Sequence, residues 1–335
     1  MFRNRASVTT LLVLMSLVFA ACASPDANET TTTAPLTVPS VAETTTTSPE
    51  TTSTEPAMPG FPLTVNSGGV TTTIEDQPTA VVSLSPTATE MLFAIGAGPQ
   101  VVAVDEYSYY PDEAPVTDLS GFTPNLEAIV AYEPDLVIVS DDIDGIVASL
   151  QGVDVPTLVL PGAQSVQDAY DQIRLLGDAT GMISEAEAVA SEMEMEIASL
   201  VAGIERLAEP LTYYHELGSD GGGSFYSVTS STFIGEVFGA FGLENIADPA
   251  DSDGFGYPVL SVEFIIDADP DLIFFTNCCG DTPETIAARP GWDSITAVQE
   301  GALYELDDDL SSRWGPRLVE FFRLVADALA ERSEG

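Results

Sequence analysis

The sequence contains no lysine, and its nine basic residues are all arginines. Without lysine the chain cannot form a Schiff base with a substrate, and it lacks the GxxxxGK[ST] loop that binds nucleotide phosphates. The one histidine, His215, cannot supply the two or three imidazoles of a typical catalytic zinc centre. We therefore expect no nucleotide hydrolysis and no metal site built from protein ligands.

Positive charge is scarce throughout. Asp and Glu number 53 against nine arginines, which gives a formal net charge of −44. Such a chain is repelled by nucleic acid phosphates and anionic lipid headgroups, so we expect no nucleic acid partner. The chain has 335 residues, of which 45% are hydrophobic, and this is enough for one large domain or for two lobes with real cores.

The N-terminus has the pattern of a secretory signal peptide over residues 1–21. Arg3 and Arg5 precede an apolar run from Val8 to Ala21, which is shorter than a membrane-spanning helix. The sequence Phe19-Ala20-Ala21-Cys22 resembles a bacterial lipobox, although Phe stands where Leu is usual. This resemblance implies lipidation of Cys22, attachment to the cell membrane and an extracytoplasmic location. The alternative is simple secretion with Cys22 as an ordinary thiol.

Residues 22–59 are rich in Thr, Ser, Pro and Glu and contain almost no large apolar side chains. Such a segment cannot bury enough surface to offset its ordering entropy, so we expect a flexible stalk after the lipidated cysteine. The other cysteines, Cys278 and Cys279, are adjacent. They could form a strained disulfide, pair between chains or stay reduced. Two adjacent thiols do not suit the tetrahedral coordination of a metal ion such as zinc.

From residue 60 onward the pattern is that of a folded α/β protein. Apolar and polar residues alternate in Phe61–Asn66 and Val70–Ile74, around Ser67-Gly68-Gly69, which predicts a β-hairpin. Short apolar strands then alternate with helices, which favours a parallel sheet covered on both faces. The predicted strands are Ala80–Leu84, Val101–Val104, Leu136–Ser140 and Thr157–Leu160, and the predicted helices are Thr87–Ile95, capped by Ser85-Pro86, and Asn125–Tyr132.

Helical periodicity dominates residues 166–209. Two helices are predicted, Val166–Thr180 and Ser184–Leu207, the second opened by a capping box of Ser184 and Glu187. At 1.5 Å per residue the second helix would be about 35 Å long, which is enough to bridge two lobes. Beyond Pro210 strands and helices alternate again. We therefore expect an N-terminal lobe at 60–165, a helical linker at 166–209 and a C-terminal lobe at 210–335.

An internal repeat relates the two halves. PNLEAIVAYEPDLVIV, from Pro124 to Val139, resembles VLSVEFIIDADPDLIFF, from Val259 to Phe275, with Glu127 aligned to Glu263. A weaker similarity relates Ser83–Gly98 to Ser227–Gly242. Two equivalent α/β lobes follow, and a ligand would bind between them, near the carboxyl ends of their strands.

These segments, with SLSPTATEMLFAIGAG, VDEYSYYPDEAP and DDLSSRWGPRLVE, resemble the class III substrate-binding proteins of bacterial importers for cobalamin and ferric siderophores. The resemblance runs from about Gly60 to the end of the chain. It implies two parallel-sheet α/β lobes joined by one long rigid helix, a shallow cleft, and delivery of ligand to the permease and ATPase of an ABC importer. We expect a monomer without enzymatic activity and without a cofactor, whose ligand itself carries cobalt or iron.

The resemblance also implies roles for individual residues. Glu127 and Glu263, early in equivalent short helices, correspond to glutamates that pair with arginines of the permease, which suits charge-assisted docking. Either glutamate could instead only favour its helix dipole. The positions that match cleft residues, or that lie beside them, are Tyr107, Phe122, Phe225, Tyr257, Asp309, Arg313 and Trp314.

Two departures weaken a corrin-specific interpretation. Gly121 and Ser140 stand where cobalamin-binding relatives present tryptophans, so a ferric siderophore or haem remains an alternative ligand. His215 is either an axial metal ligand or, more simply, a structural residue of a strand. Ordinary core packing is also an alternative for each aromatic residue, and we expect it for Trp292.

Other functions are compatible with the sequence. An extracellular hydrolase with two catalytic carboxylates is one alternative, although 53 acidic residues make any one pair uninformative. A sensor that binds ligand without a transporter is another.

Overall fold

The computed structural model describes residues 60–205 and 209–334. The predicted signal peptide, the lipidation site Cys22 and the stalk lie outside the described residues. The N-terminal lobe begins with an antiparallel hairpin of β1 (Leu63–Ser67) and β2 (Val70–Ile74), as predicted. Ser67 anchors this hairpin to the lobe, because its hydroxyl donates a 2.6 Å hydrogen bond to the carbonyl of Val159.

The sheet of the N-terminal lobe is parallel and has the strand order β5-β4-β3-β6-β7. Its central strand β3 is buried along its whole length, as expected for a sheet with both faces covered. The strands are β3 (Val81–Leu84), β4 (Val101–Asp105), β5 (Val116–Leu119), β6 (Leu136–Val139) and β7 (Thr157–Val159), and the helices are α1 (Pro86–Ala94), α2 (Leu126–Val130) and α3 (Ile146–Gln151). Strand β5 and helix α3 were not predicted.

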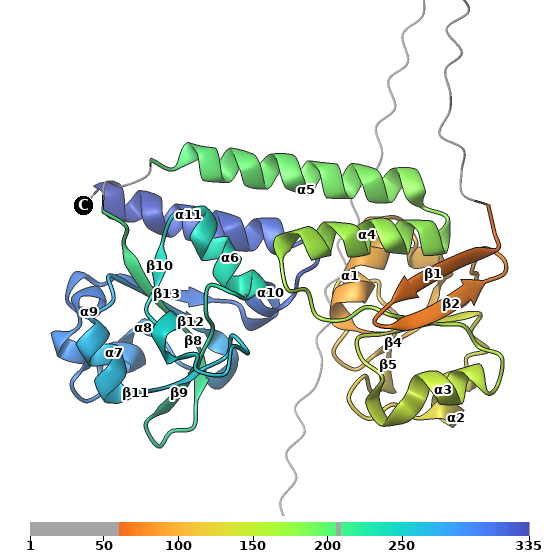
Figure 1. Cartoon of the computed structure of the whole chain (residues 1–335), viewed down its shortest axis with the longest axis horizontal. Coiled ribbons are helices and arrows are strands. Elements are labelled where there is room, and N and C mark those ends of the chain that lie inside the picture. Colours follow the sequence, from red (N-terminus) through yellow and green to blue (C-terminus); the bar gives the residue numbers. More distant parts are fainter. Residues whose placement is uncertain (1–59, 206–208, 335) are drawn as a thin grey trace, which may run out of the picture. The chain divides into compact units, whose positions relative to one another are not determined.

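Two helices connect the lobes, α4 (Val166–Thr180) and α5 (Ile183–Gly203). Figure 1 shows α5 running beside α4 at one end and beside α11 (Leu318–Glu334) at the other. With 21 residues, α5 is about 32 Å long and fits the linking helix of the predicted fold. None of the helices in residues 60–205 and 209–334 is both long and apolar enough to cross a bilayer.

The predicted capping box of α5 is wrong. Gly181 ends α4 in the left-handed conformation, so the chain reverses at once and α5 begins at Ile183. Ser184 therefore lies inside the helix, and the carboxylate of Glu187 instead accepts a 2.8 Å hydrogen bond from Arg174 on α4. A capping box is present at the start of α4, formed by Ser165 and Asp168.

The C-terminal lobe has a six-stranded sheet in the order β11-β9-β8-β12-β13, with β10 also paired to β8. Strands β8, β10, β12 and β13 are parallel, but β9 runs antiparallel to β8 and to β11, so this sheet is mixed. The strands are β8 (Thr212–Ser219), β9 (Ser224–Ser227), β10 (Glu244–Asn245), β11 (Val259–Ser261), β12 (Leu272–Thr276) and β13 (Leu303–Leu306). The helices are α6 (Phe233–Ala240), α7 (Val262–Ala268), α8 (Pro283–Ala287), α9 (Thr296–Glu300), α10 (Asp308–Ser312) and α11.

The sequence repeat has a structural counterpart in hydrogen bonds. In the N-terminal lobe, the backbone N–H and the hydroxyl of Thr79 donate to Asp135 over 2.8 and 2.9 Å. In the C-terminal lobe, the same two groups of Thr212 donate to Asp271 over 2.9 Å. Each aspartate belongs to a Pro-Asp-Leu copy and holds the chain at the start of the central strand of its lobe.

The weaker similarity aligns strands that are not equivalent. Ser83 lies in β3, the central parallel strand of its sheet, whereas Ser227 lies in β9, which is antiparallel. Both segments lead into a helix with a hydroxyl N-cap, Ser85 for α1 and Thr232 for α6. The local strand–turn–helix pattern is therefore repeated, but the strand that corresponds to β3 in the second lobe is β8.

Candidate functional site

Loops at the carboxyl ends of the strands meet between the lobes. The loop after β4 provides Tyr109, whose hydroxyl donates a short hydrogen bond to Asp309 of α10, just after β13. The guanidinium of Arg313 donates to the backbone carbonyl of Tyr107 over 3.2 Å. We call the segments 105–111, 120–123 and 307–314 the interlobe face.

A buried ion-pair cluster closes one side of the interlobe face. Glu90 of α1 is 3% exposed, and its carboxylate accepts hydrogen bonds from Arg313 over 2.9 Å and from Arg317 over 2.6 Å. Arg313 also pairs with Asp309 over 2.6 Å. The cluster therefore joins the first helix of the N-terminal lobe to the C-terminal end of the chain, across more than 200 residues of sequence.

This cluster corrects the interpretation of Arg313 as a ligand contact. The residue is only 7% exposed, and its guanidinium is occupied by Glu90, Asp309 and the carbonyl of Tyr107. In this structure Arg313 connects the two lobes. The sequence did not predict the pairing, because Glu90 reads as one residue of an apolar helix and its partners lie far away in the chain.

The predicted aromatic contacts divide into exposed and packed side chains. Tyr107 and Phe122 are 47% and 70% exposed and form an edge-to-face pair with ring centroids 5.7 Å apart. Tyr257 is 52% exposed. Trp314 packs edge-to-face against Phe233 and donates from its indole nitrogen to Gln172 over 2.8 Å.

Phe225 does not belong with the exposed aromatic residues. It is 6% exposed and packs against Trp292, with the guanidinium of Arg289 5.0 Å from its ring centroid. In this structure the side chain is part of the core of the C-terminal lobe. Trp292 is fully buried, as expected for a packing residue.

A second buried ion pair lies next to Phe225. Glu216 is 1% exposed and is bound by both terminal nitrogens of Arg289, over 2.6 and 2.8 Å. Tyr214 also donates its hydroxyl to Glu216 over 3.2 Å, and Asp281 lies 3.1 Å from Arg289. Sequence reasoning missed this network because its members are 73 residues apart.

His215 is fully buried in the C-terminal lobe, with its ring 5.5 Å from that of Phe238. Burial lowers its pKa to about 3, so the imidazole is neutral at physiological pH. Burial inside the lobe favours a structural role for His215 in β8.

Two carboxyl groups of the interlobe face have raised pKa values. Asp105 is 2% exposed and accepts a hydrogen bond from the backbone N–H of Tyr107, yet burial raises its pKa. Burial, together with the charges of Asp309 and Asp307, also raises the pKa of Asp308. The shift of Asp105 thus reflects burial alone, whereas that of Asp308 also reflects the neighbouring negative charges.

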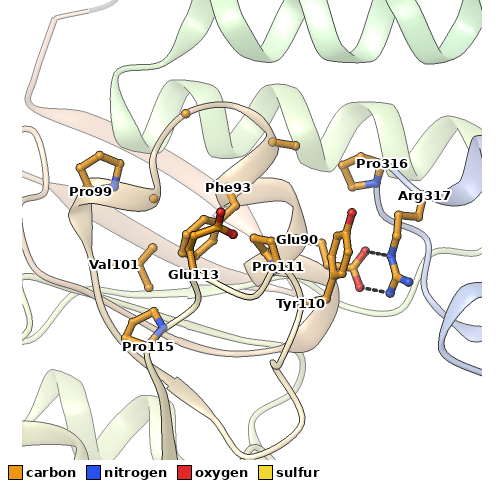
Figure 2. A pocket seen from close by; sticks show the side chains of 13 residues that line it. Glu90, Phe93, Pro99, Val101, Tyr110, Pro111, Glu113, Pro115, Pro316 and Arg317 are labelled. Atoms are coloured by element: carbon orange, nitrogen blue, oxygen red, sulfur yellow. Dashed lines mark hydrogen bonds and ion pairs between the residues drawn. The ribbon is translucent and has the colours of Figure 1, made fainter. Parts of the chain in front are cut away.

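A cavity of about 730 Å³ runs along α1, from the Glu90–Arg317 pair to the amino ends of β4 and β5 (Figure 2). Its walls are mostly apolar, with Phe93, Tyr110 and several prolines, and its polar end is occupied by the ion pair. It includes none of the predicted ligand residues. In the described part of the chain no cluster of three or more His, Cys, Asp or Glu residues is arranged to hold a metal ion.

Glu127 and Glu263 occupy equivalent places in the two lobes. Each is the second residue of its helix, α2 or α7, and each helix has a side-chain N-cap, Asn125 or Ser261. Both glutamates are exposed. Figure 1 shows both helices on the side of their lobes away from α5.

Comparisons with known proteins agree with this architecture. The periplasmic binding protein family model matches residues 81–310. An uncharacterised ABC transporter substrate-binding lipoprotein of Bacillus subtilis, YvrC, is 28% identical over 278 residues, covering 80% of this chain and 86% of the relative. A cobalamin-binding protein of Halobacterium salinarum is 29% identical over 280 residues, covering 80% of this chain and 74% of the relative.

Among solved structures, a possible iron-binding periplasmic solute-binding protein from Staphylococcus epidermidis has the same fold. Its TM-score is 0.67 at 24% identity, and the match covers 76% of this chain and 99% of that one. The family model alone covers more than half of the present sequence. The chain therefore belongs to the periplasmic binding protein family, whose members are solute-binding proteins of ABC importers and not enzymes.

Proposed function

We propose that this protein is the extracytoplasmic, lipid-anchored receptor of an ABC importer, which captures a metal-containing nutrient between its lobes and delivers it to a permease. The nutrient is a corrinoid or a ferric chelate. The proposal is supported by one observation above all: the duplicated lobes present an exposed glutamate at the same helical position, Glu127 on α2 and Glu263 on α7. Membership of the family sets aside the alternative of a hydrolase.

The two glutamates suit recognition of a partner with two basic sites. A carboxylate at the first turn of a helix is held away from its lobe by a rigid element, and arginine binds carboxylates through two parallel hydrogen bonds. Charge pairs of this kind orient a complex more than they tighten it. In this proposal the ligand contacts and the docking contacts lie on different elements, so they are separable by mutation.

The test is a double substitution, Glu127→Ala with Glu263→Ala. We expect binding to permease-containing membranes to fall at least tenfold, while ligand affinity stays unchanged. A matched control is Asp118→Ala with Asp267→Ala, which removes one exposed carboxylate from each lobe. Equal binding of the two double variants to the membranes would favour a sensor without a transporter.

The anchor has its own test. Substitution of Cys22 by Ser should release the protein from the membrane fraction and abolish incorporation of labelled fatty acid. A variant that remains in the membrane fraction and still incorporates lipid would contradict anchoring at this residue.

A further inference from the structure

The positive charge of the described chain is fully neutralised. Residues 60–205 and 209–334 contain six arginines and no lysine. Each of these arginines has a carboxylate oxygen within 3 Å of its guanidinium: Arg174 with Glu187 and Glu194, Arg289 with Glu216, Arg313 with Glu90 and Asp309, Arg317 with Glu90, Arg323 with Glu196, and Arg332 with Glu300. The only histidine is buried and neutral.

Three of these arginines have largely inaccessible side chains. The side chains of Arg313, Arg289 and Arg317 are 8%, 15% and 19% exposed. The other three are more exposed, but they belong to α4 and α11, which lie beside α5 (Figure 1). A ligand at the carboxyl ends of the strands would therefore meet no uncompensated guanidinium among the described residues.

The loops that leave these strand ends instead carry acidic residues. Glu106 follows β4, Asp141 and Asp142 follow β6, Asp220 follows β8, and Asp307 begins the run of three aspartates after β13. Burial of carboxyl groups at this face is already unfavourable enough to raise the pKa of Asp105 and of Asp308. An anionic ligand would be repelled by the carboxylates of these loops, and a buried charge without a partner is strongly unfavourable.

We propose that the ligand of this protein is uncharged or cationic overall, with amide or hydroxamate groups rather than carboxylates or catecholates around its metal. This inference rests on the proposed function and narrows it. Amide N–H groups of such a ligand would donate to the carboxylates of the interlobe face, as charge-assisted hydrogen bonds. Its apolar surface would pack on the exposed rings of Tyr107 and Phe122.

The test compares ligands matched in size and different in charge. The purified full-length chain is titrated, with tryptophan fluorescence and calorimetry as readouts, against cyanocobalamin and against its derivatives in which one or more propionamides are hydrolysed to carboxylates. The ferric arm compares a cationic hydroxamate chelate with an anionic tris-catecholate chelate and with haem. The first arm adds one negative charge at a time without changing the shape of the ligand.

We expect cyanocobalamin or the hydroxamate chelate to bind, and each added carboxylate to weaken binding by about tenfold or more. The discrimination should decrease in 1 M salt, because screening shortens the range of the repulsion. Anionic probes that bind as tightly as their neutral counterparts would overturn the inference and leave the proposed function intact. Failure of every probe, whatever its charge, would instead contradict the proposed function.

A variant locates the effect at the interlobe face. Asp309→Asn removes one carboxylate and leaves Arg313 paired with Glu90, so we expect the ratio between the amide and carboxylate corrinoids to fall several-fold. Asp327→Asn, on the exposed face of α11, is the control and should leave the ratio unchanged. An Asp309→Asn protein with the ratio of the unaltered chain would show that this charge does not select the ligand.

Discussion

Asp135 and Asp271 occupy the same place in the two Pro-Asp-Leu copies, and each holds the start of the central strand of its lobe. Both accept hydrogen bonds from the backbone N–H and the hydroxyl of a threonine, Thr79 or Thr212. An ionised carboxylate is suited to this role because it accepts two hydrogen bonds at once. It has no donor of its own, so it does not bind the carbonyl groups that the strand uses in the sheet. These hydrogen bonds explain why both copies of the repeat contain an Asp at this position.

Substitution of these aspartates should destabilise the protein unequally. Asp271→Ala should lower the free energy of unfolding by about 2 kcal/mol, since hydrogen bonds to a charged acceptor are lost at a half-buried site. Asp135→Ala should cost less, because Asp135 is exposed. Urea unfolding measures both, with Asp118→Ala as the control. A loss for Asp271→Ala no larger than that of the control would contradict the assigned role.

His215 makes stability depend on pH. Burial lowers its pKa from 6.5 to about 3 in the folded state, so between these values the unfolded chain binds a proton that the folded chain does not. The contribution of this group to the unfolding free energy is therefore fully present above pH 6.5. It is lost as the pH falls from 6.5 toward 3, with a slope that approaches about 1.4 kcal/mol per pH unit.

The measurement is urea unfolding at pH 7 and pH 5 for the unaltered chain and for His215→Leu. We expect the variant to lose less stability over this interval, because leucine has no proton to bind. The comparison cancels the contributions of the carboxyl groups. Identical losses in the two proteins would contradict a buried neutral imidazole.

Ion pairs and hydrogen bonds join the two lobes in addition to the long helix α5. Helix α1 is tied to the start of α11 through Glu90 and Arg317, and to the end of α10 through Arg313. On the C-terminal side, Glu236 of α6 accepts a 2.7 Å hydrogen bond from the backbone N–H of Val166, the first residue of α4. A carboxylate at this position satisfies an otherwise unpaired N–H and suits the helix dipole.

Glu90→Gln tests the main connection. The substitution keeps the volume of the side chain but removes the carboxylate that pairs with Arg317 and one of the two carboxylates that pair with Arg313, so we expect a loss of about 3 kcal/mol of unfolding free energy. A double-mutant cycle with Arg317→Gln separates the pair energy from the general effect of each change. Hydrogen exchange should also increase in α1 and α10 of the variant. If the losses of unfolding free energy in Glu90→Gln and Arg317→Gln add up to the loss in the double variant, the two residues are not coupled.

Net negative charge is the dominant physical feature of this protein. The net charge of −44 opposes compaction, because the six arginines of the described residues can pair with only a small part of the acidic side chains. Salt shortens the Debye length from about 10 Å at 0.1 M to about 3 Å at 1 M, so it screens this repulsion.

The thermal unfolding midpoint should therefore rise between 0.1 and 1 M NaCl, by about 3 °C for each kcal/mol of relieved repulsion. Differential scanning calorimetry measures this shift. Sucrose at matched osmolality is the control for general effects of solute exclusion on stability. An unchanged or lower midpoint in salt would show that the excess of acids is not a net cost to the fold.

Much of the architecture could be predicted from local pattern. The hairpin, the helix from Val166 to Thr180 and the short helices that carry Glu127 and Glu263 follow from alternation, periodicity and capping residues close together in the chain. Strand β5 was missed because its exposed polar residues do not distinguish it from a loop. The capping box of α5 was misplaced because Gly181 sets the start of that helix.

Composition and local pattern are enough to predict the two-lobe α/β plan, the repeat and the excess of negative charge, because these features depend on residue types and on neighbours within a few residues. Which charged groups meet depends instead on the three-dimensional fold. Arg313 pairs with Glu90 across 223 residues, and Arg289 with Glu216 across 73. The fold also buries Phe225 and exposes Phe122, although both residues are phenylalanines. Burial and ion pairing depend on which distant surfaces come together, and no local pattern records that.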